Sequence, residues 1–482
     1  MLIKTAAGKE LPVEMHKVRM VQNVRLIPAE DRLKAIAEAG YNTFLLKARD
    51  VYLDMLTDSG VNAMSDNQYA ALMNPDDSYA GSQTFYIFVD AVKDVLGYEH
   101  VMNVHQGRAA EHLLSKVFGK PGGVTITNYH FTTTKAHIEV TGGSTCLELF
   151  TDEALKVKSA HPFKGNMDIQ KLKDAVRKWG RDKIGYVRME ATTNLIGGQP
   201  FSMANLKEVR KVCDENGLIL VMDGSLIAEN AYFIWKREQG YANRTVAEIV
   251  KEMAAQADLM YMSGRKDTSV RGGMIATNNK ELFGRLEPWL PVYEGFFTYG
   301  GMSIREIGAM AVGMREMVDP AVAGSTIEQI KYFVETLDKM GIPVITPAGG
   351  LACHVDARNF APHLRKEGYI AGAVVAALYI ASGVRAMERG TISMDRDKDG
   401  NDVYAELELC RIAIPRRVYT VSHIEYIITR LQWLYENRNL IEGLKFVSEP
   451  PVLRFFMGRL DALDGWSRKL CDAFKKDFGP EW

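Results

Sequence analysis

Two basic residues that follow an apolar run are the first candidates for chemistry in this chain. The run Leu259–Met262 has the composition of a buried strand, and it ends at Ser263, shortly before Arg265 and Lys266. Partial burial beside a second cation favours the neutral form of a lysine amine, which is the form that attacks a carbonyl carbon. The pattern indicates a reactive lysine, although a solvated Arg-Lys pair on a loop fits the same residues.

Two other stretches carry groups that would complement such a lysine. The apolar run Leu218–Met222 ends in Asp223, a position from which a carboxylate can face a cationic ring nitrogen such as a pyridinium. The turn Gln106–Arg108 precedes a helical pattern, and free amides at a helix start favour a phosphate. A phosphate seat, an acid and a lysine in this order are typical of pyridoxal-phosphate enzymes of the aspartate-aminotransferase fold.

Short motifs along most of the chain resemble one family of such enzymes. They include Leu56-Thr-Asp-Ser-Gly60, His105-Gln-Gly-Arg108, Met262-Ser-Gly-Arg-Lys-Asp267, Met387-Glu-Arg-Gly390 and Leu453-Arg-Phe-Phe456. From about Lys17 to about Leu463 the chain is similar to the β-eliminating lyases, the family that contains tryptophanases and tyrosine phenol-lyases. Many matches in one order are specific for the family and say less about the substrate.

The resemblance implies an α/β protein with the fold type I of pyridoxal-phosphate-dependent transferases. Strand-like runs that alternate with helical patterns from about Asn62 to about Asn278 agree with this fold. We expect residues 1–55 to form an N-terminal segment that packs with the small domain. Residues 56–320 should form the large cofactor-binding domain with a mostly parallel sheet, and residues 321–482 a smaller α+β domain.

Composition excludes several classes of function. The net charge of −1 over 482 residues provides no field that would recruit nucleic acid or an anionic membrane. The charge-free stretch Gly368–Val384 is shorter than the about 20 residues of a membrane span, so it predicts a buried helix. An odd number of well-separated cysteines and a start without an apolar core predict a cytoplasmic protein with reduced thiols.

The resemblance assigns the cofactor site to particular residues. Lys266 would bind pyridoxal 5′-phosphate as an imine and, once freed by the substrate, would remove the Cα proton. Asp223 would keep the ring nitrogen protonated, and Phe131 would stack on the ring, although a core aromatic fits Phe131 nearly as well. The other cofactor-binding residues implied are Gln106, Gly107, Arg108, Asn194, Ser263 and Arg265.

The resemblance also assigns the substrate site. Tyr79 would protonate the leaving ring carbon, while Arg389 and Thr132 would hold the phenolic oxygen. Arg411 would bind the α-carboxylate, because a buried arginine needs an anion. For the residues expected around the ring, core packing is an equal alternative. The substrate-binding residues implied are Thr57, Asn194, Arg411, Met387, Phe455 and Phe456.

The expected reaction is the α,β-elimination of L-tyrosine to phenol, pyruvate and ammonia by a homotetramer. The alternatives are the same elimination on another β-substituted or aromatic amino acid, a catalytically silent homologue that retains the cofactor, and an aminotransferase. Leu226 makes another substrate credible, because the family has an arginine there and leucine donates no hydrogen bond.

Two possible cation sites remain open at this stage. The resemblance implies a monovalent cation such as K⁺ near Gly60, Asp77 and Arg271, but Arg271 stands where the family has asparagine and is able to displace the cation. The stretch Asp395–Glu406 has the spacing of an EF-hand calcium loop. Its flanks have the pattern of strands, so we expect a polar hairpin tip there.

Overall fold

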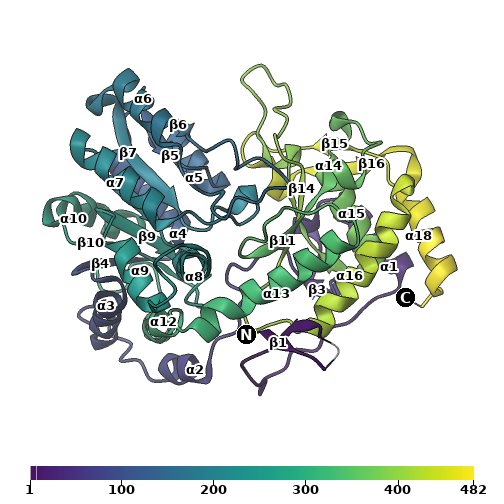
Figure 1. The fold of residues 1–482 in the computed structure, drawn as a ribbon, viewed down its shortest axis with the longest axis horizontal. Helices are drawn as coiled ribbons and strands as arrows, with labels where there is room; N and C mark the ends of the chain where they lie inside the picture. The colour runs from purple at the N-terminus through teal and green to yellow at the C-terminus, as the bar shows by residue number, and fades with distance from the viewer. Residues whose placement is uncertain (1, 7, 482) are drawn as a thin grey trace. The chain divides into compact units, whose positions relative to one another are not determined.

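The computed structural model describes residues 2–6 and 8–481, and the chain divides into two compact units. Unit 1 comprises Met1–Asp58, Leu155–Ala160 and Glu328–Trp482, and unit 2 comprises Ser59–Ala154 and His161–Ile327 (Figure 1). Helix α13 (Pro320–Lys339) contains one of the points at which the chain passes from one unit to the other. Each unit has its own hydrophobic core.

Unit 2 is built on a seven-stranded sheet with the order β4-β10-β9-β8-β7-β5-β6. The strands β5 to β9 pair in parallel, and β10 pairs antiparallel with both β4 and β9. The predicted mostly parallel sheet is therefore confirmed. In chain order the strands are β4 (His100–Val104), β5 (Val124–Thr127), β6 (Thr145–Glu148), β7 (Ile184–Glu190), β8 (Leu220–Asp223), β9 (Leu259–Ser263) and β10 (Gly273–Thr277).

Helices cover both faces of this sheet. Successive side chains of a strand point to opposite faces, so the apolar side chains on each face need a helix to pack against. Along β8, Val221 packs into a core with helix α4, whereas Met222 packs into a second core with α7 and α9. The helices of unit 2 are α2 (Asp66–Met73), α3 (Gln83–Leu96), α4 (Gly107–Phe118), α5 (Thr132–Ala136), α6 (Ile169–Trp179), α7 (Met203–Asn216), α8 (Ile227–Arg237), α9 (Val246–Ala254), α10 (Lys280–Leu286), α11 (Leu290–Tyr293) and α12 (Ile304–Glu316).

Unit 1 has a three-stranded antiparallel sheet in the order β11-β14-β13. Every residue of α15 (Ile370–Ser382) is buried, which confirms the predicted buried helix. The other helices of the unit are α1 (Ala29–Glu38), α14 (Ala357–Phe360), α16 (Val421–Glu436), α17 (Arg454–Met457) and α18 (Trp466–Phe478). The strands are β1 (Leu2–Lys4), β2 (Glu10–Pro12), β3 (Leu53–Asp54), β11 (Ala352–Asp356), β12 (Val384–Arg385), β13 (Met387–Arg389), β14 (Leu409–Ala413), β15 (Leu444–Ser448) and β16 (Arg459–Ala462).

The N-terminal segment is part of unit 1 through backbone and side-chain bonds. Strand β3 pairs in parallel with β12. The buried Arg32 donates from Nε to the Ile380 carbonyl at 2.7 Å, near the C-terminal end of α15, where a cation is favourable. In the described part of the chain, no helix has the length and apolar character that a membrane crossing requires. The five cysteines are buried free thiols.

The acidic stretch Asp395–Glu406 lies between β13 and β14, with a single 3-10 turn, Thr391–Ser393, before it. Oδ1 of Asp397 accepts the backbone N–H groups of Asp399 at 2.9 Å and Asn401 at 2.8 Å. The flanking α-helices of an EF-hand are thus missing from this described stretch, as expected for a hairpin tip. Nor does any group of three or more acidic, histidine or cysteine side chains among the described residues have the arrangement of a metal site.

Candidate active site

The turn that carries Lys266 follows β9 directly, and hydrogen bonds fix it on both sides. Nδ2 of Asn62 donates to the Lys266 carbonyl at 2.9 Å, and Oγ1 of Thr268 donates to the Gly264 carbonyl at 2.6 Å. The half-buried Lys266 places Nζ 5.2 Å from the centre of the Phe131 ring. The structure therefore brings together the predicted lysine and the predicted stacking aromatic.

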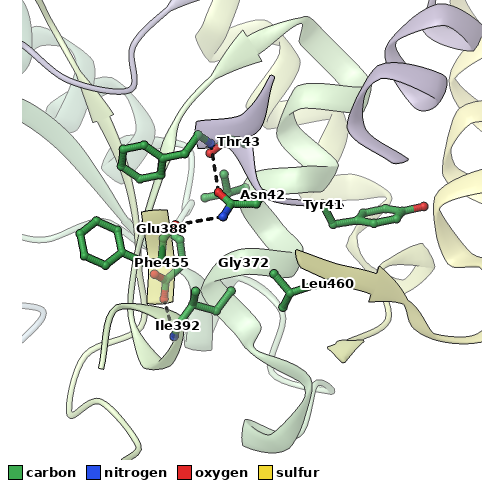
Figure 2. Close-up of a pocket in the computed structure, with 10 residues that line it drawn as sticks. Tyr41, Asn42, Thr43, Gly372, Glu388, Ile392, Phe455 and Leu460 are labelled. Atoms are coloured by element: carbon green, nitrogen blue, oxygen red, sulfur yellow. Dashed lines mark hydrogen bonds between the residues drawn. The ribbon is translucent and has the colours of Figure 1, made fainter. Parts of the chain in front are cut away.

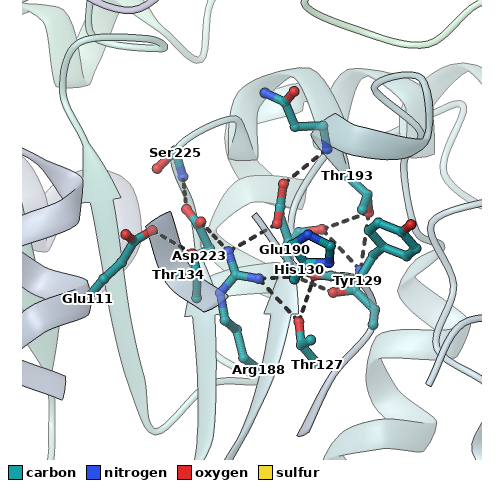
Figure 3. Close-up of polar contacts among 12 residues, drawn as sticks. Glu111, Thr127, Tyr129, His130, Thr134, Arg188, Glu190, Thr193, Asp223 and Ser225 are labelled. Carbon is teal, nitrogen blue, oxygen red and sulfur yellow. Dashed lines mark hydrogen bonds and ion pairs between the residues drawn. The ribbon is translucent and has the colours of Figure 1, made fainter. Parts of the chain in front are cut away.

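Asp223 ends β8 and is almost fully buried, at 6% exposed. Its Oδ2 accepts a hydrogen bond from Nη2 of Arg188 at 2.6 Å, and its Oδ1 accepts the Ser225 N–H at 3.0 Å (Figure 3). The Tyr261 hydroxyl also donates to Oδ2, at 2.9 Å. Burial alone would raise the pKa of Asp223, but the charges of Arg188 and Lys266 outweigh it and lower that pKa. The carboxylate is therefore ionised at neutral pH and lies within the electrostatic reach of Lys266.

The predicted phosphate seat lies at the start of α4. Gln106 is the N-cap residue, and a Cβ on Gly107 would be 3.0 Å from Cβ of Ser263, so glycine permits this close approach. Burial and the charges of Arg271 and Arg108 lower the pKa of Arg265. The guanidinium groups of Arg108, Arg265 and Arg271 form a positive region that fits a phosphate.

In unit 1, Arg411 and Met387 lie side by side on paired strands. Arg411 is 2% exposed, and its Nη2 donates to the Leu56 carbonyl at 2.9 Å and to Sδ of Met387 at 2.7 Å. Burial lowers the pKa of Arg411 to about 10, against the opposing charge of Asp58. Thr57 follows Leu56 in the chain, so the predicted carboxylate-binding residues of this unit are neighbours.

Arg389 and the two predicted ring-pocket phenylalanines form a second group in unit 1. The guanidinium carbon of Arg389 lies 5.4 Å from the centre of the Phe455 ring, and Arg389 is 5% exposed. The rings of Phe455 and Phe456 are 4.0 Å apart, and both meet Phe44 edge-on. An aromatic wall beside a buried guanidinium is suited to a ring that carries an oxygen.

Tyr79 lies on an exposed part of unit 2, beside other aromatic side chains. Its side chain is 71% exposed and its ring lies 5.9 Å from that of Phe296 and 5.1 Å from that of Tyr299. A hydrogen bond with the Tyr299 phenol raises the pKa of Tyr79, so the phenol is protonated at neutral pH.

The two remaining predicted site residues, Thr132 and Asn194, are buried in unit 2. Thr132 follows Phe131 at the start of α5. The backbone N–H of Asn194 donates to Oε1 of Glu190 at 3.0 Å.

The structure also shows the surroundings of the residues at which this chain departs from the family pattern. The buried Leu226 precedes α8, and its carbonyl accepts the Asn230 N–H at 3.1 Å. A Cβ on Gly60 would be 2.6 Å from Nη2 of Arg265, so the arginine packs directly on this glycine. The exposed Asp77 forms an ion pair with Arg305 at 2.7 Å, and Arg271 is exposed.

A small pocket, partly open to solvent, lies beside the Arg389 strand in unit 1 (Figure 2). Glu388 lines it, together with apolar side chains that include Phe455. Glu388 accepts the Ile392 N–H at 3.1 Å and the Ser393 hydroxyl at 2.7 Å. Burial and the nearby Glu408 carboxylate raise the pKa of Glu388 to about 7.

Comparison with known proteins identifies the family. The model of the β-eliminating lyases matches residues 54–430. The chain belongs to the β-eliminating lyase family. It is 46% identical to a tyrosine phenol-lyase of Symbiobacterium thermophilum, over 93% of this chain and 98% of the relative. A tyrosine phenol-lyase of Nostoc punctiforme is 42% identical, over 93% and 96% of the two chains.

Solved structures with low sequence identity confirm the predicted fold of this β-eliminating lyase. A serine palmitoyltransferase from S. paucimobilis matches with a TM-score of 0.56 at 14% identity, over 81% of this chain and 89% of that one. The threonine aldolase of Leishmania major matches with a TM-score of 0.55 at 14% identity, over 80% and 99%. At this identity the likeness concerns the fold alone.

Sequence reasoning missed the polar residues that surround Asp223 in this β-eliminating lyase. Arg188 and Glu190 lie inside a strand whose seven residues are all buried. Two charges at a spacing of two within a buried strand point to the same face, where they need polar partners. This spacing was the signal that would have pointed to them, whereas Tyr261 and Glu111 gave none.

Proposed function

We propose that this β-eliminating lyase cleaves L-tyrosine to phenol, pyruvate and ammonia with pyridoxal 5′-phosphate. The observation that carries the proposal is the 42–46% identity to tyrosine phenol-lyases over nearly the whole chain. The surroundings of Lys266 and Asp223 in unit 2 agree with it, and so do those of Arg389 in unit 1. A structure of the same fold, the serine palmitoyltransferase, contains bound pyridoxal phosphate as a myriocin aldimine.

The residues of unit 2 have the chemistry to hold this cofactor. Lys266 offers an amine, Asp223 a buried ionised carboxylate, and the start of α4 with Arg108 and Arg265 a cationic seat for a phosphate. When bound, pyridoxal phosphate supplies an aldehyde for an amino group and a ring that withdraws electrons from Cα. Phe131, near Nζ of Lys266, is proposed to pack on the ring.

Two proton transfers are proposed for the side chains of this chain. Lys266, once its amine is free, takes the proton from Cα of the substrate. Tyr79, whose phenol is protonated at neutral pH, then gives its proton to the ring carbon that carries the leaving bond. Arg411 with Thr57 and Asn194 is proposed for the α-carboxylate, and Arg389 with Thr132 for the phenolic oxygen. Met387, Phe455 and Phe456 are proposed for the ring.

Tyr79 also bears on the proposed assembly. We propose a cytoplasmic homotetramer in which Tyr79 serves a site that includes another subunit, because its side chain is 71% exposed within this chain. Mixing and reassembling the inactive variants Tyr79→Phe and Lys266→Ala tests this arrangement. Recovery of part of the activity supports a site shared between subunits, and no recovery in mixed tetramers contradicts it.

For the cation position we propose that arginine takes the place of potassium. Arg265 packs on Gly60, and the carboxylate of Asp77 is already paired with Arg305. The activity should then be the same in K⁺ and Na⁺ salts at equal ionic strength. A large loss of activity in Na⁺ would support a bound K⁺ near Gly60, Asp77 and Arg271 instead.

A second candidate function is the same elimination on a β-substituted amino acid without a phenol. Leu226 favours it, because a leucine supplies no hydrogen bond where relatives are expected to have an arginine. The test is a panel of tyrosine, tryptophan, S-methylcysteine and β-chloroalanine, assayed for pyruvate. Equal amounts of phenol and pyruvate from tyrosine support the main proposal, whereas pyruvate from S-methylcysteine alone supports the second.

A further inference from the structure

Four neighbouring strands bring a row of polar side chains to the same face of the unit 2 sheet. In the register of the sheet, Asp223 of β8 is paired with Glu190 of β7 and with Tyr261 of β9. Arg188 lies two residues before Glu190 and is paired with Thr127 of β5. Paired residues and residues two apart share a face, so the sheet itself sets this row.

Arg188 is held by all of these strands. Its Nη1 donates to Oγ1 of Thr127 at 3.1 Å, and its Nη2 donates to Oε2 of Glu190 at 3.0 Å as well as to Asp223 (Figure 3). Its Nε donates to the Tyr261 hydroxyl at 2.9 Å. The side chain is fully buried. A planar guanidinium fixed at so many points holds the Oδ2 atom of Asp223 in one position.

Tyr261 fixes the same oxygen from the other side. Its hydroxyl accepts a hydrogen bond from Arg188 and donates one to Oδ2 of Asp223 at 2.9 Å. With both of these partners on Oδ2, the Oδ1 atom accepts the Ser225 N–H at 3.0 Å (Figure 3), and the Ser225 side chain also hydrogen-bonds the carboxylate. The orientation of the carboxylate is thus set by Arg188 and Tyr261, which both bond to Oδ2.

The charges of this row favour a cation next to Asp223. Asp223 and Glu190 share the single guanidinium of Arg188. The nearby Glu111 accepts hydroxyl groups of Thr133 at 2.7 Å and Thr134 at 2.6 Å, and burial together with the Asp223 charge raises the pKa of Glu111 toward its neutral form. Burial likewise raises the pKa of Glu190, against the charges of Arg188 and Lys266, so the buried acids of this row favour neutralisation by a proton or by a nearby cation such as a protonated ring nitrogen.

We infer that Arg188 and Tyr261 are positioning residues that present Asp223 as an ionised, oriented partner for the pyridine nitrogen of the cofactor. The inference rests on the proposed role of Asp223 and deepens it. It adds that the strength of the Asp223 contact is set by side chains that do not themselves touch the cofactor. Removing either neighbour should raise the pKa of Asp223, so that the proton between the two groups moves from the ring nitrogen toward the carboxylate.

The test measures that proton directly. Holoenzyme is prepared with cofactor labelled with ¹⁵N in the ring, and the ¹⁵N chemical shift is followed over the neutral pH range. Tyr261→Phe removes one hydrogen bond to a charged group, so the ring-nitrogen pKa should fall by about one unit, or about tenfold in the protonation equilibrium. Arg188→Met should have a larger effect, and Arg188→Lys should recover part of it.

Tyr186→Phe is a matched control. Tyr186 lies on β7, two residues before Arg188, is 2% exposed, and its hydroxyl lies 3.5 Å from Oγ of Ser115. This variant loses a buried phenol hydroxyl without changing a bond to Asp223, so its nitrogen shift should equal that of the wild type.

Each result has a distinct meaning. An unprotonated ring nitrogen in the wild type overturns the role of Asp223 and with it the basis of the inference. A protonated nitrogen in the wild type, with the same shift in Tyr261→Phe, Arg188→Met and Tyr186→Phe, overturns the inference alone. Should one variant not fold, the other decides, because each acts on Oδ2 from a different side. Altered shifts in the Tyr261 or Arg188 variants alone support it.

Discussion

Replacing Glu388 with glutamine should remove a pH-dependent loss of stability in this enzyme. Burial and the Glu408 carboxylate raise the pKa of Glu388 from 4.5 to about 7 in the folded chain. The fold therefore favours the protonated carboxyl. The stabilisation is fully present below the unfolded pKa and is lost as the pH rises through the folded pKa.

The size of the effect follows from the pKa difference. At about 1.4 kcal/mol for each pKa unit, the shift from 4.5 to about 7 corresponds to an upper bound of roughly 3.5 kcal/mol between about pH 4.5 and about pH 8. Glu388 lines a pocket that is partly open to solvent, so we expect roughly 1.5 to 3 kcal/mol. Glutamine keeps an acceptor for the Ile392 N–H and stays neutral at every pH.

The assay is urea unfolding of the wild type and the variant at about pH 5 and about pH 8. The free energy of unfolding should fall with pH more steeply in the wild type than in Glu388→Gln. Glu406→Gln is the control, because Glu406 is exposed on the same hairpin. Equal pH dependence in the wild type and Glu388→Gln would refute the reasoning about the buried carboxyl.

Three further predictions concern the sites described above. Arg389→Ala should lower kcat/KM for tyrosine by about 10- to 100-fold and that for S-methylcysteine by much less, and equal losses would contradict the proposed phenol contact. Gly273→Ala should weaken cofactor binding by about tenfold, because the added Cβ would be 2.8 Å from the Gln106 carbonyl carbon. Titration of the apoenzyme with the cofactor measures this loss. The control Gly284→Ala, which has open space around the added Cβ, should bind the cofactor as the wild type does. Asn42→Ala should lower the free energy of unfolding by about 1 to 3 kcal/mol, since Nδ2 donates to the carbonyls of Phe455 and Gly458, and an unchanged urea midpoint would argue against this.

The strands and helices with clear periodicity were predictable from the sequence. The apolar run before Asp223 is β8, the run before Ser263 is β9, and the charge-free stretch is α15. Each has a composition that suits one environment along its whole length. The acid at the end of β8 and the lysine after β9 were predictable for the same reason, because strand ends position the residues that follow them.

Elements whose residues depend on distant partners were not predictable. The strand β11 went unnoticed because His354 and Asp356 interrupt its apolar pattern. The antiparallel pairing of β10 depends on β4, which lies far away in sequence.

The site shows the same division. The residue types at Lys266, Asp223 and Arg411 suggested their chemistry, whereas the contacts of Arg188 with Asp223 and of Tyr79 with Phe296 depend on which segments the fold brings together. The functional roles of the site residues came from the family resemblance and stay predictions.

Reduction of the holoenzyme with borohydride, followed by peptide mapping, tests the central claim most directly. The account predicts that the yellow colour is lost and that the reduced cofactor is found on the peptide that contains Lys266. A cofactor attached to another lysine, or a protein that takes up no pyridoxal phosphate, would contradict it.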